Sequence, residues 1–197
     1  MTIIAPVQLP HFKSRSRSMT EQMYSLTPFP NGSIPAIQIT AHVSRENGLL
    51  HIQYRLTGET GTIGLPDKST MPGRKVDLWS NTCFEFFVAR PDDPRYWEFN
   101  LSPSGDWNVY RMDAYRQVGF REESQVQRLQ LETRMEAGSI MLEAAVDLSP
   151  LIPENQPVQL GISSVIQGID QHKTFWSLVH SQLEPDFHAR ESFVIHL

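Results

Sequence analysis

The chain has 197 residues, of which 40% are hydrophobic and 20% are charged, close to the usage of ordinary globular domains. This balance argues against a disordered chain, and the sequence contains no apolar run of the length that a membrane-spanning helix needs. A formal net charge of -5 gives no electrostatic reason to approach a nucleic-acid backbone. We therefore expect one soluble domain with no nucleic-acid or membrane partner.

The cysteine content and the first residues favour a cytoplasmic protein. Cys83 is the single cysteine, so no internal disulfide can form. The first residues lack the charged and apolar regions of a signal peptide. Met19 is an alternative to Met1 as the start of the protein.

The first part of the chain is predicted to be an irregular arm. Residues 1 to about 35 contain five prolines and an Asn-Gly pair. We place residues 1–24 in this arm and residues 25–197 in the folded domain. Apolar and polar residues then alternate over residues 37–43 and 50–56, which predicts two strands joined by a turn at residues 44–48.

The remainder of the chain is also rich in predicted strands. Residues 58–74 hold four glycines and two prolines and are expected to form a long loop. Further strands are predicted at residues 82–89, 96–101, 107–112, 127–135, 140–146, 158–166, 174–180 and 192–197. No helical stripe of useful length is found, so the pattern predicts an all-β, two-sheet antiparallel sandwich of about ten strands, jelly-roll or immunoglobulin-like.

Glu85 is the first candidate site residue, because it interrupts an otherwise apolar run from Cys83 to Val88. A strand of this kind is expected to be buried on both faces. A buried, unpaired carboxylate is very costly, so Glu85 must be paired with a cation, hydrogen-bonded to a ligand, or neutral. An internal Glu-Arg pair and a ligand site are both consistent with the sequence.

The next strand places polar groups in a row. Alternation puts Tyr96, Glu98 and Asn100 on one face and Trp97, Phe99 and Leu101 on the other. The polar row would bind hydroxyl groups if it lines a concave sheet, and water if it faces outward. The register of the following hairpin decides which residues join Glu98: Trp107, Val109 and Arg111, or Asn108, Tyr110 and Met112.

A second group of candidates lies near the end of the chain. Trp176 and His180 share a strand face, and Asp186 and His188 follow in a loop. The two histidines and the aspartate could bind a metal, but no HExxH or paired-Cys motif is present, so a His-Asp hydrogen bond that anchors the loop is favoured. Glu85 and Glu98 on neighbouring strands could also form a glycosidase acid pair.

Three segments carry a resemblance to bacterial DOMON-like domain proteins: LWSNTCFEFFVARPDDPRYWEFNLSPSGDWNVYRMDAYR, FWSLVH and PDFHARESFVIHL. The resemblance extends from about Ser25 to Leu197. It implies a sandwich related to DOMON domains and family 9 carbohydrate-binding modules, whose members bind sugars or haem. The residues that match the family pattern are Trp79, Cys83, Glu85, Glu98, Asn100, Ser102, Gly105, Trp107, Tyr115, Arg116, His180, Pro185, Asp186, Phe187 and His188.

The resemblance also raises the question of cofactors. Haem-binding relatives use a Met and a His as axial ligands; neither position matches a defined residue of this sequence, and Met112 and His180 are candidates without a motif to support them. Sugar-binding relatives often hold calcium, and Asp92-Asp93 could serve, although a solvated acidic turn is favoured. No metal is predicted, and the cofactor is left open.

We therefore expect a non-catalytic domain that binds a carbohydrate or another small polar metabolite. The alternatives are a haem-binding domain, a glycoside-cleaving enzyme that uses Glu85 and Glu98, and a structural or interaction protein, with a homodimer compatible with any of them. The expected ligand-binding residues are Glu85, Glu98, Asn100, Trp107, Arg116, Trp176, His180, Asp186 and His188. These residues would surround a concave binding site, which would be closed by residues 58–74 and by the loop Pro185–His188.

Overall fold

The computed structural model describes residues 22–30, 32–116 and 121–197, which form twelve strands and three short 3-10 helices. The 3-10 helices are η1 (Thr60–Thr62), η2 (Leu78–Ser80) and η3 (Arg190–Ser192). No helix in this part of the chain is long and apolar enough to cross a membrane. The strands are β1 (Gln22–Pro28), β2 (Ile37–Glu46), β3 (Leu49–Gly58), β4 (Cys83–Ala89), β5 (Tyr96–Leu101), β6 (Trp107–Met112), β7 (Arg121–Glu122), β8 (Gln130–Glu136), β9 (Ser139–Asp147), β10 (Gln159–Gln167), β11 (Lys173–Ser177) and β12 (Ile195–His196).

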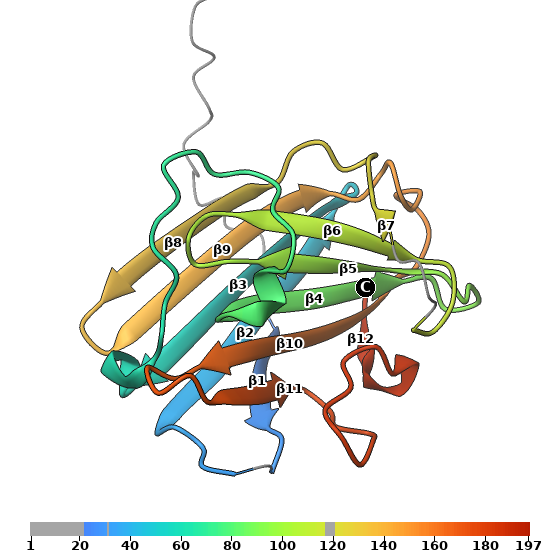
Figure 1. The fold of residues 1–197 in the computed structure, drawn as a ribbon. Helices are drawn as coiled ribbons and strands as arrows, with labels where there is room; N and C mark the ends of the chain where they lie inside the picture. Colours follow the sequence, from blue (N-terminus) through green and yellow to red (C-terminus); the bar gives the residue numbers. More distant parts are fainter. Residues whose placement is uncertain (1–21, 31, 117–120) are drawn as a thin grey trace, which may run out of the picture.

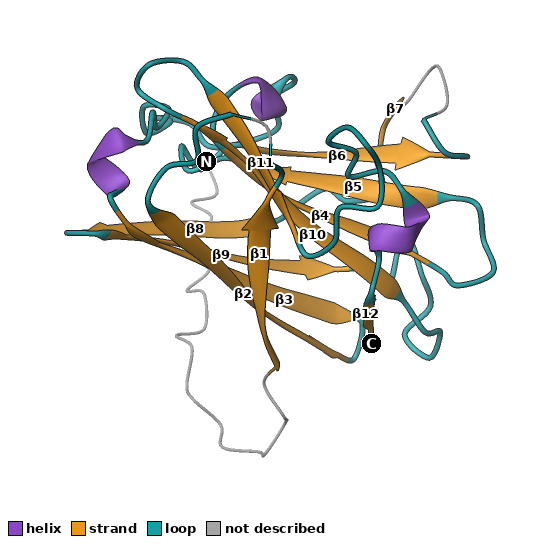
Figure 2. Cartoon of the chain, turned by 90° about the horizontal axis from the view of Figure 1, so that it is seen from below, coloured by secondary structure: helices purple, strands orange, loops and turns teal. Residues whose placement is uncertain are grey.

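The strands form two antiparallel sheets that pack face to face (Figures 1 and 2). The first sheet has the order β1-β2-β3-β9-β8, and the second has the order β11-β10-β4-β5-β6-β7, with β12 paired to β10. β1 joins the two, because Gln22–Leu26 pair with β2 whereas Thr27 and Pro28 pair with β11. The predicted two-sheet antiparallel sandwich is confirmed.

The first sheet follows the alternation of its sequence. In β2 and β3 the apolar residues face the core and the polar residues face outward, as the period of two requires. The hairpin between them turns at Asn47 and Gly48, both of which have positive φ (48° and 80°). An Asn-Gly pair supplies this left-handed backbone at low cost, and its twist matches that of the flanking strands.

The centre of the second sheet is buried on both faces. Phe84, Phe86 and Val88 of β4 point into the core between the sheets, where Phe86 stacks on Phe99 of β5 with ring centroids 4.4 Å apart. Tyr54 of β3 crosses this core and donates a hydrogen bond of 2.6 Å to the carbonyl oxygen of Glu85. This bond fixes the position of β4, and therefore of the Glu85 side chain on its opposite face.

The structure corrects three expectations about the elements. A strand, β1, lies inside the stretch that was expected to be irregular and crosses the boundary placed between residues 24 and 25, while residues 1–21 lie outside the described part of the chain. Near the end, β11 stops at Ser177 instead of continuing to residue 180, and the last predicted strand is shortened to β12, Ile195–His196. The short β7 lies in a stretch for which no strand was predicted.

Candidate functional site

A cavity of about 410 Å³ lies on the outer face of the second sheet. Its floor comes from alternate residues of β4, β5, β6, β10 and β11, and its walls come from η2, from Arg116 and from the loop before η3. η2 lies in front of β4 and β5 in Figure 1. The cavity is lined by Trp79, Glu85, Phe87, Glu98, Tyr110, Met112, Arg116, Val165, Phe175, Pro185, Phe187 and His188.

Strand register brings the acidic residues of the floor together. Glu85 of β4 lies opposite Asn100 of β5, and Phe87 lies opposite Glu98, so that the two carboxyl groups are diagonal neighbours on one face. Glu98 in turn lies opposite Tyr110 of β6. Of the two hairpin registers allowed by the sequence, the structure therefore has the one that places Tyr110 and Met112, rather than Trp107, beside the acids.

Both carboxyl groups are held where the neutral form is favoured. Glu85 is 3% exposed, and its Oε2 accepts a hydrogen bond of 3.3 Å from Ser163 Oγ. Burial, followed by the charge of Glu98, raises the pKa of Glu85 well above its usual range, against the effect of Ser163. Burial also raises the pKa of Glu98 to about 7, although the Asn100 amide donates to its Oε1 at 2.9 Å.

His188 adds a neutral imidazole to the same cavity. Tyr96 Oη lies 3.0 Å from His188 Nδ1 and also accepts a 3.4 Å hydrogen bond from the backbone N–H of Arg116. Burial, followed by the charge of Arg116, lowers the pKa of His188 to about 4, so the ring is neutral at pH 7. When the Tyr96 hydroxyl donates a hydrogen bond to Nδ1, the neutral imidazole carries its own proton on Nε2. This Nε2 atom lies 3.9 Å from Glu98 Oε2.

Asp186 organises the wall that contains His188. Its Oδ1 accepts hydrogen bonds from Arg116 Nη2 (3.0 Å) and from the backbone N–H of His188 (2.9 Å), while its Oδ2 accepts one from Tyr115 Oη. Burial raises the pKa of Asp186, but these hydrogen bonds outweigh burial and hold it below its usual value. Arg116 itself has a positive φ of 43°, and its backbone and side-chain hydrogen bonds keep it in this strained conformation.

Trp79 gives the cavity an exposed aromatic rim. It lies in η2 after the loop that precedes β4, and half of its surface (50%) is accessible to solvent. Lys173 of β11 lies near this ring, with Nζ 6.0 Å from the ring centroid. A large apolar ring that remains exposed beside a cavity is available to a ligand, because it is not used in the core.

Two tryptophans that were expected to stack on a ligand are instead core residues. Trp107 and Trp176 are 7% and 3% exposed and lie between the sheets. The guanidinium group of Arg74 lies 4.6 Å from the centre of the Trp107 ring, and Trp176 Nε1 donates to Thr174 Oγ1 at 2.9 Å. Both predictions were wrong because the alternation in β6 and β11 directs these side chains inward.

Other expected site residues occupy supporting or distant positions. Asn100 is fully buried behind Glu98, and Asp186 acts on Arg116 and His188 rather than lining the cavity. His180 does not line the cavity, since its Nε2 lies 2.9 Å from the carbonyl oxygen of Thr27 on β1. The predicted closing loop, residues 58–74, contributes no lining residue, and Trp79 takes that place.

The donor residues do not fit the cofactors considered from the sequence. Met112 lines the cavity but His180 does not, so this pair cannot supply two axial ligands to one haem. In the described part of the chain no group of three or more His, Cys, Asp or Glu residues is placed to hold a metal ion. Asp93 is used locally, since its Oδ1 accepts a 3.0 Å hydrogen bond from the backbone N–H of Arg95.

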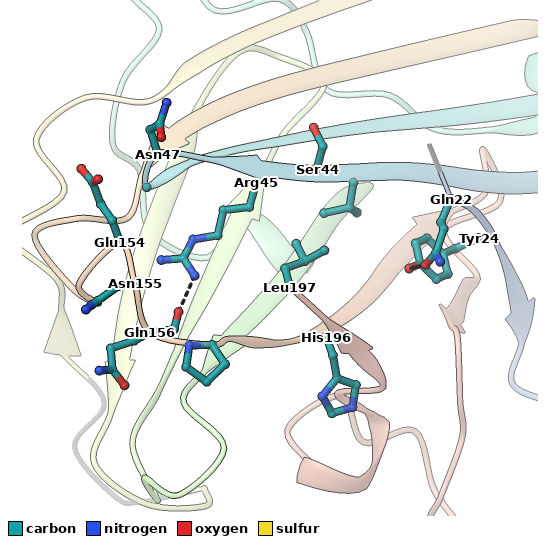
Figure 3. Close-up of a pocket in the computed structure, with 13 residues that line it drawn as sticks. Gln22, Tyr24, Ser44, Arg45, Asn47, Glu154, Asn155, Gln156, His196 and Leu197 are labelled. Atoms are coloured by element: carbon teal, nitrogen blue, oxygen red, sulfur yellow. Dashed lines mark hydrogen bonds between the residues drawn. The ribbon is translucent and has the colours of Figure 1, made fainter. Parts of the chain in front are cut away.

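A second hollow, of about 540 Å³, lies at the end of the β2–β3 hairpin (Figure 3). Arg45 is its central charged group, and it donates to the carbonyl oxygens of Gln156 (2.7 Å) and Pro153 (3.2 Å). Figure 3 shows this side chain directed at the loop that closes the hollow. Because Arg45 is committed to backbone carbonyls, we interpret it as a clamp on residues 153–157.

Sequence reasoning missed most of the apolar lining of the cavity. Phe87 shares the strand face of Glu85, and Tyr110 shares that of Glu98, so alternation could have identified both once the register was known. Trp79 carried a signal of its own, since it matches the pattern of the resembling family. Val165 and Phe175 face the cavity only because β10 lies beside β4 and β11 lies beside β10, and nothing in the sequence gives that strand order.

No protein-family model matches the chain, and no curated protein matches its sequence. Solved structures with a similar fold do exist. A candidate carbohydrate-binding protein from Bacteroides uniformis has a TM-score of 0.61 at 14% identity, over 88% of this chain and 84% of that chain. A family 9 carbohydrate-binding module from Caldicellulosiruptor kristjanssonii, in complex with cellotriose, has a TM-score of 0.51 at 10% identity, over 83% and 75% of the two chains. The fold is thus that of a carbohydrate-binding module, while a relationship to DOMON domains stays a prediction.

Proposed function

We propose that the chain binds a carbohydrate in the cavity on the outer face of the second sheet. The observation that carries this proposal is the combination, in one cavity of about 410 Å³, of an exposed tryptophan ring at the rim and hydrogen-bonding groups on the floor and wall. A sugar has an apolar ring face and a polar edge, so it is recognised by stacking on an aromatic ring and by hydrogen bonds to its hydroxyl groups.

The geometry assigns separate roles to these residues. Trp79 is suited to stacking on the sugar ring, and Phe187 provides an apolar surface in the wall formed by the loop before η3. Glu85 and Glu98 are suited to hydrogen bonds with hydroxyl groups, and the Nε2–H of His188 is a further donor. Asp186, Asn100 and Tyr96 position these groups, which preserves the shape of the site before a ligand arrives.

The fold of the chain supports the same proposal. Two solved structures that share it are described as carbohydrate-binding, and one of them holds cellotriose. A fold by itself does not establish a function. The cavity supplies the local chemistry that the fold likeness lacks, and the two observations are independent of each other.

The test is calorimetric titration with mono- and oligosaccharides, including glucose and cellotriose, on the protein and on Trp79→Ala. We expect saturable binding that weakens about fivefold or more in Trp79→Ala, since stacking on an aromatic ring contributes about 1 kcal/mol or more. Met135→Ala, an exposed substitution on β8 of the other sheet, is the control and should bind normally. If Trp79→Ala binds as well as the wild type and Arg45→Ala does not, the ligand occupies the hollow of Figure 3 instead.

A second candidate function is hydrolysis of a glycosidic bond, because two carboxyl groups share the cavity and the pKa of Glu98 is raised to about 7, as in a general acid. That reaction also needs an ionised partner, whereas burial raises the pKa of Glu85 as well. Incubation with nitrophenyl glycosides distinguishes the two functions. Turnover that disappears in both Glu85→Gln and Glu98→Gln would establish an enzyme, and binding without turnover would leave the binding function.

A further inference from the structure

We infer that the ligand of the cavity carries a positively charged amine, which makes an amino sugar the best-fitting carbohydrate. This inference rests on the proposed function and concerns the same site. It follows from two properties of the cavity: two buried acids that have no lysine or arginine partner among the described residues, and five aromatic rings in the lining.

The first property is a pair of buried acids on the cavity floor that lack a cationic partner in the part of the chain that the structure describes. The Glu85 carboxyl group accepts a hydrogen bond from Ser163, and the Glu98 carboxyl group accepts one from Asn100. His188 Nε2 lies 3.9 Å from Glu98 Oε2. Within the described part of the chain, no lysine or arginine forms an ion pair with either acid. Buried acids are normally paired, so the floor has room for one missing cation.

The single guanidinium group in the cavity lining does not fill that place. Arg116 is committed to Asp186, through Nε at 3.2 Å and Nη2 at 3.0 Å. His188 cannot replace it, because its ring is neutral at pH 7. Lys173 lies against the Trp79 ring at the rim and is absent from the cavity lining. The guanidinium group of the wall is therefore paired with an acid of the wall, and the acids of the floor have no lysine or arginine partner within the described ranges.

The second property is the number of rings around the acids. Five aromatic rings line the cavity: Trp79, Phe87, Tyr110, Phe175 and Phe187. The faces of such rings attract an ammonium group or another ligand cation that is placed over them, and cages of aromatic rings bind quaternary ammonium ligands in this way. Aromatic rings that share a cavity with acids lacking a lysine or arginine partner suit a charged amine.

The decisive experiment is a comparison of three closely matched sugars by calorimetric titration at pH 7: glucosamine, glucose and N-acetylglucosamine. Glucosamine carries the charge, glucose lacks the nitrogen, and N-acetylglucosamine keeps the nitrogen without its charge. We expect glucosamine to bind at least tenfold more tightly than either neutral sugar. Its binding should also release protons, seen as a dependence of the heat on the ionisation enthalpy of the buffer, because a bound ammonium group favours the ionised acids.

Variants locate the effect and separate this inference from the proposed function. Glu98→Gln and Glu85→Gln keep the size of the side chain and should reduce the preference for glucosamine to about twofold or less, while Glu132→Gln, on β8 of the other sheet, should retain it. Equal binding of glucose and glucosamine would overturn the inference and leave the carbohydrate function standing. A preference for glucosamine that survives in both cavity variants would place the amine elsewhere. Absence of binding by every sugar, including the oligosaccharides, would overturn both proposals.

Discussion

The outer faces of the two sheets differ sharply although both arise from strands. On the first sheet, His51, Gln53 and Arg55 of β3 point outward and stay partly or fully exposed. On the second, Glu85 and Phe87 of β4 point outward and are buried. The difference comes from what lies over each face, since η2 and the loop before η3 cover the second sheet. Alternation determines which side chains share a face, and the covering segments determine whether that face becomes a site.

The largest effect is expected where the covered face is packed. Phe87→Ala should destabilise the protein by about 3–5 kcal/mol, because Phe87 packs against Phe193 and His188 with ring centroids 5.5 and 5.2 Å away. Gln53→Ala at the middle of β3 should change stability by about 0.5 kcal/mol or less. Urea unfolding of both variants measures the contrast, and similar values for the two would mean that the second sheet has no packed outer face.

A smaller effect, with a defined pH dependence, is expected at Glu98. Its pKa is raised in the folded protein to about 7 from the ordinary value of 4.5, so the folded state retains a proton that the unfolded state releases. The contribution of Glu98 to the free energy of unfolding is therefore greatest below about pH 4.5. It falls as the pH rises through about 7, by about 3 kcal/mol in total. Glu98→Gln removes this loss, and the variant should be the more stable protein at pH 8.

The control for this prediction is Glu132→Gln on the exposed outer side of the first sheet. Chemical unfolding at pH 5 and pH 8 should give a difference between Glu98→Gln and the wild type that grows with pH, and no such growth for Glu132→Gln. A constant difference for Glu98→Gln would show that the carboxyl group ionises as easily in the folded protein as in water.

The smallest effect is expected in the covering loop itself. Asp186→Asn weakens the hydrogen bonds to Arg116 and His188 and should cost about 1 kcal/mol, because the arginine is half exposed to solvent. The pKa of Asp186 is lowered in the folded state, so its contribution to stability is present above the ordinary value of 3.8 and is lost as the pH falls through the lowered value.

Asp147→Asn, at the end of β9, is the matched control, since Asp147 Oδ1 accepts a hydrogen bond of 2.8 Å from the backbone N–H of Ser149. Unfolding at pH 3 and pH 7 tests whether the cost of Asp186→Asn is smaller in acid.

Much of the fold could be predicted from local patterns. The ends of β5 and β6 can be predicted because two aromatic-rich segments flank a Ser-Pro-Ser-Gly turn. The hairpin of β2 and β3 can be predicted because two segments of alternating apolar and polar residues flank an Asn-Gly pair. β1 was missed because it ends at Pro28 in a proline-rich stretch whose residues show no clear strand pattern. Two neighbouring sheets supply its hydrogen-bond partners, and such pairing is not visible in the sequence of the strand.

The site was less predictable than the fold. Glu85 could be identified because a lone acid in an apolar strand requires an explanation, and Glu98 because it shares a face with other polar groups. Trp107 and Trp176 were misassigned because an aromatic ring next to polar residues has the same local sequence whether it faces a cavity or the core. Only the pairing of Leu101 with Trp107 separates these cases, and pairing is a tertiary property.

The double pairing of β1 also bears on self-association. Gln22–Pro28 cover the free edge of β2 and part of the free edge of β11, so detachment of this one short segment would uncover edges of both sheets. Unpaired edges are templates for strands of other chains. A second copy could donate its own β1 to these positions, which is the geometry of a domain-swapped dimer. The first strand of this sandwich thus protects it against aggregation, independently of any ligand.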